Sequence, residues 1–191
     1  MTGHAHLVDL RRAIGQLEGD LERLERWGVA VADVLEAGGR LLAAGNGGSA
    51  AQAQHLTAEL VGRYLHERRP LSAIALHADT SALTAIVNDY GTAECFARSV
   101  RAHGRQGDVL VALSTSGRSS NVLEAVEAAR SLGLRTLAFT GPAPNPLASA
   151  VDDALCVEGS TPTIQEVHQV AIHLLCESID ARIGVAVGAA Q

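Results

Sequence analysis

The chain has 191 residues, 47% of them hydrophobic and 19% charged, and its formal net charge is −6 at pH 7. This length predicts a single domain, residues 1–191, with enough sequence to bury a substantial core. The negative charge excludes a typical nucleic-acid-binding surface, because binding to phosphate backbones requires clustered Lys and Arg. The high apolar content favours burial of surface between subunits.

The cysteines and the N-terminal residues indicate the cellular compartment. Cys95, Cys156 and Cys176 are odd in number and widely spaced, which argues against a disulfide framework and favours a reducing cytosol. The N-terminus lacks the apolar stretch of a signal peptide, and no window reaches the roughly 18 uninterrupted apolar residues that span a membrane. We therefore expect a soluble, cytoplasmic protein without a membrane partner.

Residues 1–38 are predicted to form an N-terminal helical extension. Their apolar residues are spaced alternately by three and four, which is the pattern of a helical seam: Leu7, Leu10, Ile14, Leu17, Leu21 and Leu24. We expect one or two helices that stop at Gly38 and Gly39. Because the seam is narrow, it fits packing on the chain's own sheet and packing on a neighbouring subunit equally well.

From residue 40 onwards, strand-like and helical segments alternate. The expected strands are 40–44, 71–76, 108–113, 135–140 and 153–157. The expected helices run from the first glycine cluster to about Leu65, over 81–91, 92–104 and 121–133, and over 163–184, where Thr161 caps the start and Pro162 follows. Strands joined by helical crossovers predict an α/β fold, a three-layer α/β/α sandwich with a mainly parallel five-stranded sheet. The tail, residues 184–191, is expected to be frayed.

The glycine-rich stretch GNGGS, residues 45–49, follows the first strand. At the carboxyl ends of parallel strands, backbone N–H groups and helix N-termini point at ligands. Gly45, Gly47 and Ala50 fit a loose dinucleotide-binding pattern, but that site also needs an acidic residue about 20 positions further on. The nearest candidate, Asp79, lies 34 residues after Gly45, so nucleotide binding is disfavoured. The other alternative is a plain tight turn.

The stretch LSTSGRSSN, residues 113–121, follows the third strand. Its hydroxyl groups, the glycine within it and the helix that begins just beyond it can wrap a phosphate group without a lysine. A solvated turn is the alternative, but the position directly after a central apolar strand favours a binding loop.

Two pairs of polar residues can share a helix face. His55 and Glu59 are separated by four residues, so both can reach a common point, although such a pair is more often a simple hydrogen bond than a metal site. Gln165 and His173, eight apart, can also share a face. His168 lies on the opposite side of Gln165, so the helix presents either His168 or His173. Periodicity alone does not choose between them.

Taken together, GNGGSAAQAQHLTAEL, NDYG, STSGRSSN and IQEVHQVAIH resemble the sugar isomerase (SIS) domain proteins, and among them the enzymes that act on seven-carbon sugar phosphates. The likeness covers residues 40 to about 180 in the same order. It implies the SIS fold, a homotetramer with active sites between subunits, and the reversible conversion of sedoheptulose 7-phosphate to D-glycero-D-manno-heptose 7-phosphate, or a close stereoisomer, through an enediol.

The resemblance also implies the roles of individual residues. One zinc ion per site is held by His55, Glu59, Gln165 and His173, with Glu59 as catalytic base and His173 as catalytic acid. The substrate-binding residues implied are Asn46, Gly47, Gly48, Ser49, Arg63, Asp89, Ser114, Thr115, Ser116, Ser119 and Gln165.

The chain also departs from the family pattern. Arg118 stands where the family usually has Asn, and Thr163 where it commonly has Arg. These differences do not affect the implied metal-binding residues, but they leave the identity of the natural sugar substrate open. Two rival functions remain: a non-catalytic sugar-phosphate-binding or protein-interaction module on the same fold, and a nucleotide-dependent oxidoreductase. A related replication-initiator-associating protein lacks the Glu and the second His, so Glu59 and His173 favour an enzyme.

Overall fold

The computed structural model describes residues 3–184 and confirms the α/β sandwich. The strands form one sheet in the order β2-β1-β3-β4-β5, and all four pairings are parallel. The strands are β1 (Leu41–Gly45), β2 (Ala73–Ala75), β3 (Val109–Ser114), β4 (Arg135–Thr140) and β5 (Asp153–Cys156). The helices are α1 (Gly3–Leu17), α2 (Leu21–Glu36), α3 (Gly48–Val61), α4 (Thr80–Tyr90), α5 (Glu94–His103), α6 (Ser120–Ser131), α7 (Pro146–Ala150) and α8 (Thr161–Arg182).

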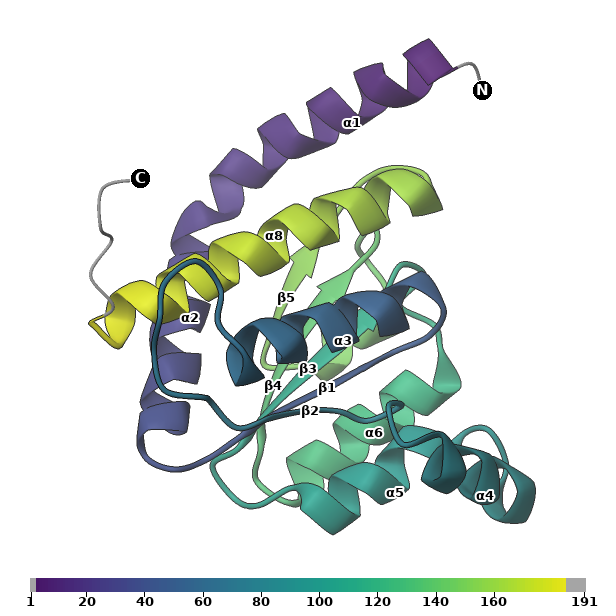
Figure 1. Ribbon diagram of the computed structural model, residues 1–191. Helices are drawn as coiled ribbons and strands as arrows, with labels where there is room; N and C mark the ends of the chain where they lie inside the picture. The colour runs from purple at the N-terminus through teal and green to yellow at the C-terminus, as the bar shows by residue number, and fades with distance from the viewer. Residues whose placement is uncertain (1–2, 185–191) are drawn as a thin grey trace.

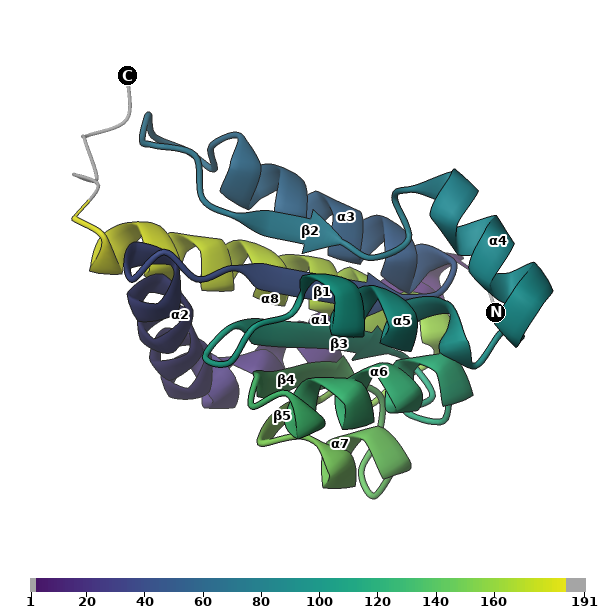
Figure 2. The ribbon, with the colours of Figure 1, turned by 90° about the horizontal axis from the view of Figure 1, so that it is seen from below.

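Helices cover both faces of the sheet (Figures 1 and 2). Alternate residues of β1 belong to different cores: Leu41 and Ala43 pack with α2, α3 and α8, whereas Leu42 and Ala44 pack with α5 and α6. Every residue of β1 and β3 is buried, as expected for central strands of a parallel sheet with two covered faces.

The register of β1 and β3 places the two predicted binding loops side by side. Gly45, the last residue of β1, pairs with Leu113, and Ser114 ends β3. The chain then leaves β1 into α3 on one face of the sheet, whereas β3 is followed by α6 on the other face. This is the topological switch point at which open α/β sheets bind their ligands.

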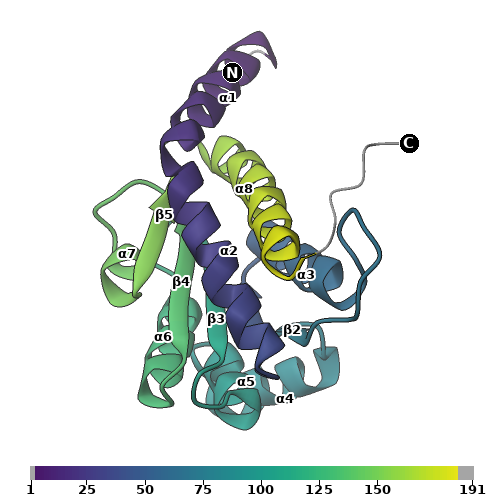
Figure 3. The ribbon, with the colours of Figure 1, turned by 90° about the vertical axis from the view of Figure 1, so that its left-hand side faces the viewer.

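The N-terminal segment forms α1 and α2, joined by a short 3-10 turn (Glu18–Asp20), as predicted. Its apolar seam divides into two rows. Leu17 and Leu24 are buried in the chain's own core, whereas Leu7 is 55%, Ile14 36% and Leu21 41% exposed. The exposed row has heptad spacing: Leu7 and Ile14 lie on α1, and Leu21 begins α2. Helix α1 projects beyond the body of the molecule (Figure 3).

Several element boundaries differ from the prediction. The helix predicted to reach about Leu65 ends at Val61, because the Arg68 guanidinium donates hydrogen bonds to the carbonyls of Glu59 and Leu60 and thereby satisfies the last turn. The N-cap of α8 is Ser160 rather than Thr161, which lies inside the helix.

The short helix α7 was not predicted. The Asn145 side chain accepts a hydrogen bond from the backbone N–H of Ala148, and Pro146 occupies the first turn. These are ordinary start signals for a helix, but only five residues follow. The strands begin or end within two residues of their predicted positions, and the predicted frayed tail lies outside the described residues from 185 onwards.

Two further sequence expectations have structural counterparts. Cys95, Cys156 and Cys176 are all free thiols. Within residues 3–184, none of the helices has both the length and the apolar character needed to span a bilayer.

Candidate active site

Three of the predicted metal ligands converge between α3 and α8. His55 Nε2 lies 2.9 Å from His173 Nε2 and 3.2 Å from Glu59 Oε1. One ligand atom from each residue lies within 4.8 Å of the other two, and all three residues are partly buried. Ligand atoms around a tetrahedral zinc ion lie about 3.4 Å apart, since the metal–ligand distances are about 2.1 Å. The donor set and its spacing therefore fit a divalent metal such as zinc.

Helix periodicity and side-chain packing produce this convergence. His55 and Glu59 lie one turn apart on α3, and α3 packs beside α8, which carries His173. Two neighbours contact the His173 ring: Gln169 Nε2 lies 3.2 Å from His173 Nε2, and the Tyr64 ring lies 5.7 Å from it at 34°. The Tyr64 ring restricts the orientation of His173. Gln169 contacts the same nitrogen that faces His55, so its amide occupies the position next to His173 Nε2 where a metal would bind.

Tyr64 adds a neutral hydroxyl to the surroundings of this cluster. Burial raises the pKa of Tyr64, and the carboxylates of Glu177 and Glu59 raise it further. The phenol therefore stays protonated at neutral pH and can donate a hydrogen bond.

Gln165, the fourth predicted ligand, lies on α8, and its side chain approaches Gly48 at the start of α3. A Cβ atom added to Gly48 would come within 2.4 Å of Gln165 Nε2, so the absence of a side chain at residue 48 makes room for this amide. The backbone carbonyl of Gln165 accepts a hydrogen bond from the Gln52 side chain, which fixes this part of α8 against α3. The role of Gln165 as a metal ligand stays a prediction.

His168 is a core residue. It is fully buried, its ring packs against Phe139, and its Nε2 lies 3.1 Å from the carbonyl oxygen of Thr140. Burial lowers the pKa of His168 to about 4. The structure thus makes the choice that helical periodicity left open, since of the two histidines only His173 is within reach of His55 and Glu59.

The glycine-rich loop is tied to α6 by an amide pair. Asn46 and Asn121 exchange two hydrogen bonds of 2.9 Å through their side chains. Gly47 has a positive φ of 55°, Gly48 is exposed, and Ser49 is buried at the start of α3. The amide pair therefore holds the loop after β1 next to the loop after β3.

The serine-rich loop after β3 presents clustered hydroxyl groups. Ser114 Oγ lies 3.1 Å from Ser119 Oγ and 3.5 Å from Ser116 Oγ, and Ser116 Oγ accepts a hydrogen bond from the backbone N–H of Arg118. Thr115 is partly buried. These hydroxyls lie at the N-terminus of α6, where the helix dipole favours an anion.

Two predicted substrate residues lie apart from this loop within one chain. Arg63 follows the end of α3 and donates a hydrogen bond to the carbonyl of Leu65. Because α3 spans about 20 Å from Gly48 to Val61 at 1.5 Å per residue, Arg63 lies at the far end of this helix from the glycine-rich loop. Asp89 is exposed on α4, where it accepts a hydrogen bond from Asn88. Their predicted roles as substrate-binding residues stay predictions.

Sequence reasoning missed Asn121, Gln169 and Tyr64. Asn121 ends the motif STSGRSSN, but nothing in the sequence indicates that its side chain exchanges hydrogen bonds with Asn46. Gln169 stands four residues before His173, so the spacing of helical neighbours could have indicated their contact. Tyr64 lies in a loop, and no periodic signal connects it with α8.

The expected acidic residue of the nucleotide-binding alternative has another role. Asp79 is the N-cap of α4, and its carboxylate accepts a hydrogen bond from the backbone N–H of Ala82. This use leaves the dinucleotide pattern without its ribose-binding residue.

Comparison with known proteins establishes the family. The sequence profile described as "SIS domain" matches residues 7–141. A protein of Streptomyces coelicolor named phosphoheptose isomerase is 61% identical over 188 residues, which are 96% of this chain and 81% of the relative. This chain belongs to the phosphoheptose isomerases of the SIS domain family. It is therefore an enzyme of the isomerase class, as predicted.

Other members of the SIS domain family agree with this placement. A phosphoheptose isomerase of Helicobacter pylori is 48% identical over 177 residues, covering 92% of this chain and 91% of the relative. The solved structure of phosphoheptose isomerase from Neisseria gonorrhoeae has a TM-score of 0.84 at 42% identity and covers 93% of this chain and 96% of that one. The SIS fold predicted from the motifs is thus confirmed.

Proposed function

We propose that this chain interconverts sedoheptulose 7-phosphate and D-glycero-D-manno-heptose 7-phosphate, or a close stereoisomer. The observation that carries the proposal is the convergence of His55, Glu59 and His173 between α3 and α8 in a chain whose relatives are named phosphoheptose isomerases. A carboxylate and imidazoles at one point are suited to moving a proton between neighbouring carbon atoms.

The metal in this proposal is zinc, held by His55, Glu59 and His173, with Gln165 as the fourth ligand. The mixed nitrogen and oxygen donors and the spacing of the first three support this choice. When bound, a divalent ion of this kind polarises a carbonyl group and offsets negative charge on its oxygen.

Glu59 is the proposed base that removes the proton next to the substrate carbonyl. Its Oε1 faces His55, and its second carboxylate oxygen remains to accept a proton. His173 is the proposed acid that delivers a proton on the other side, which completes the shift between C1 and C2 through an enediol. The packing of the Tyr64 ring beside the His173 ring supports a fixed position for this exchange.

Ser114, Thr115, Ser116 and Ser119 are proposed to bind the phosphate group, and Asn46, Gly47, Gly48 and Ser49 the sugar chain beside it. The adjacent positions of the two loops support this arrangement. Phosphate binding at one end of the substrate contributes binding energy that orients the reacting carbons at the other.

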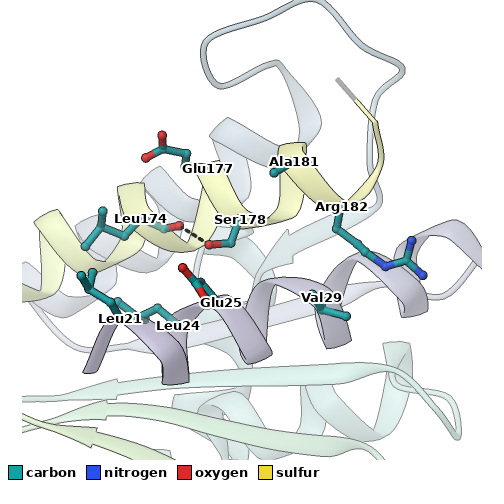
Figure 4. Close-up of a pocket in the computed structure, with 9 residues that line it drawn as sticks. All are labelled: Leu21, Leu24, Glu25, Val29, Leu174, Glu177, Ser178, Ala181 and Arg182. Atoms are coloured by element: carbon teal, nitrogen blue, oxygen red, sulfur yellow. Dashed lines mark hydrogen bonds between the residues drawn. The ribbon is translucent and has the colours of Figure 1, made fainter. Parts of the chain in front are cut away.

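The proposed assembly is a homotetramer with active sites between subunits, to which Arg63 and Asp89 contribute from neighbouring chains. The exposed row of Leu7, Ile14 and Leu21 supports a subunit contact along α1 and the start of α2. Beside it, a groove of about 560 Å³ lies between α2 and α8. Leu21, Leu24 and Leu174 gather at one end of this groove and Arg182 lies at the other (Figure 4).

Product analysis with a matched variant tests the proposed reaction. Purified protein incubated with sedoheptulose 7-phosphate should form the aldose phosphate, and Glu59→Gln should lose roughly 100-fold or more of kcat while it still binds inorganic phosphate. Full activity in the variant would remove Glu59 from the mechanism. Binding of the sugar phosphate without turnover in the unmodified protein would support the non-catalytic module instead.

A further inference from the structure

A second cavity adjoins the glycine-rich loop. It has a volume of about 360 Å³ and lies between the end of β1, the start of α3 and helices α4, α5 and α6. Its polar lining includes Asn46, His77 and Asn121, and its apolar lining includes Leu83 and Val87. The volume is in the range of small-molecule sites, which combine an apolar wall with a few placed polar groups.

His77 is the unexplained group in this cavity. It follows β2 at the carboxyl end of the sheet, and both of its ring nitrogens are buried without a hydrogen-bond partner in the described part of the chain. A buried polar atom without a partner destabilises the folded state. A native fold that retains two such atoms on one side chain calls for a partner that the isolated chain does not supply.

The chemistry of His77 suits an uncharged hydroxyl group. Burial lowers the pKa of His77, so the ring is neutral at pH 7, with one nitrogen donating a hydrogen bond and the other accepting one. A hydroxyl group can do both in return. The side chain as a whole is only partly buried, and χ2 of histidine is broad and roughly two-fold, so a half-turn of the ring exchanges its nitrogens with its carbons.

The remaining lining favours an uncharged ligand group. No Lys or Arg of residues 3–184 lines the cavity, and Thr92 is its one hydroxyl side chain among these residues, so it lacks the cluster of hydroxyl groups that the serine-rich loop offers a phosphate. The reciprocal amides of Asn46 and Asn121, by contrast, are matched to hydroxyl groups. The cavity therefore suits the hydroxylated carbon chain of a sugar phosphate whose phosphate group lies in the adjacent serine-rich loop.

We propose that His77 is a specificity-determining residue that hydrogen-bonds a hydroxyl group of the sugar chain. This inference rests on the proposed sugar-phosphate isomerisation and adds a residue to its substrate site. The cavity that Asn46 lines then forms part of the substrate site. The length and hydroxyl pattern of the substrate are recognised there, on the side of the glycine-rich loop that faces α4 and α5.

Substitution His77→Leu tests the proposal, because leucine has similar size and no polar atom. The value of kcat/KM for sedoheptulose 7-phosphate should fall by about 10-fold or more, the effect of one lost hydrogen bond to a buried partner. For ribulose 5-phosphate, which has a shorter hydroxylated chain, kcat/KM should change less. The affinity for inorganic phosphate should stay the same, and the midpoint of thermal unfolding should stay equal or rise.

A matched variant, His103→Leu, replaces an exposed histidine at the end of α5 that lies outside this cavity, and it should behave as the unmodified protein. The proposal is overturned if kcat/KM of His77→Leu stays within about twofold of the unmodified protein. It is also overturned if the variant loses thermal stability and phosphate affinity together, since His77 would then have a structural role.

A binding measurement separates failure of this inference from failure of the proposed reaction. Glucitol 6-phosphate has no carbonyl group and cannot be isomerised, so calorimetry reports its affinity whether or not the chain is active. His77→Leu should bind it about 10-fold more weakly, with unchanged affinity for inorganic phosphate. The role of His77 is overturned if the unmodified protein and His77→Leu bind glucitol 6-phosphate with equal affinity, or if neither protein binds it.

Discussion

Replacement of His168 by glutamine should change how the stability of the protein depends on pH. The His168 ring is fully buried, and its pKa is lowered from 6.5 to about 4. Between these values the unfolded chain binds a proton that the folded chain does not. The free energy of unfolding therefore falls as the pH decreases through this window and is highest above pH 6.5. A glutamine side chain does not titrate, and its amide can still donate to the Thr140 carbonyl.

The size of the effect follows from the two pKa values. At pH 5, a histidine with pKa 6.5 is mostly protonated, whereas one with pKa about 4 is mostly neutral. This difference lowers the free energy of unfolding by about 2 kcal/mol relative to pH 7.5, and by about 3 kcal/mol once the pH is below 4. At pH 7.5, His168→Gln should itself be less stable, because the contact of the ring with Phe139 is lost.

Urea unfolding at pH 7.5 and pH 5 measures this difference. The unmodified protein should lose about 2 kcal/mol more than His168→Gln between the two pH values. His103→Gln, at an exposed histidine, should behave like the unmodified protein, so it controls for the loss of a titrating group in general. Equal losses in the unmodified protein and His168→Gln would refute the assignment of His168 to the core as a neutral histidine.

Three further substitutions test the site. Ser116→Ala should raise KM for the sugar phosphate about 10-fold, because a hydroxyl donor to a charged group is lost, with kcat within about twofold; an unchanged KM counts against the serine-rich loop as the phosphate site. Arg118→Asn removes a guanidinium group that forms no ion pair in the described residues and adds positive charge beside the serine-rich loop. KM for the sugar phosphate at low salt should therefore rise about twofold to fivefold, and the effect should shrink at high salt. Equal KM values at low salt would show that Arg118 faces solvent. Gly48→Ala places a Cβ 2.4 Å from Gln165 Nε2, so zinc titration should show about 10-fold weaker binding with little change in stability; unaltered zinc affinity would remove Gln165 from the ligand set.

The sequence predicts the fold well because its signals are local and repeated. Apolar strands alternate with amphipathic helices, and glycine marks the ends of several of them, so all five strands were predicted. The predicted end of α3 was wrong because the observed end depends on hydrogen bonds from Arg68. This residue lies outside the periodic helical segment but close to its last turn in space. A capping interaction of this kind leaves no periodic signal.

The candidate site is only partly predictable from sequence for the same reason. The i, i+4 spacing pairs His55 with Glu59, but only the packing of α3 against α8 brings His173 to them. The family resemblance, and not the periodicity, chose His173 over His168. His77 was missed altogether, because its lack of partners is a property of the folded surroundings.

Metal titration of the purified protein, with activity followed at each step, tests the proposed site most directly. Metal-free protein should be inactive with sedoheptulose 7-phosphate, activity should return in proportion to bound zinc up to one ion per chain, and His173→Ala should neither bind that ion tightly nor recover activity. Full isomerase activity in protein shown to contain no metal would contradict the convergence of His55, Glu59 and His173 as a metal centre.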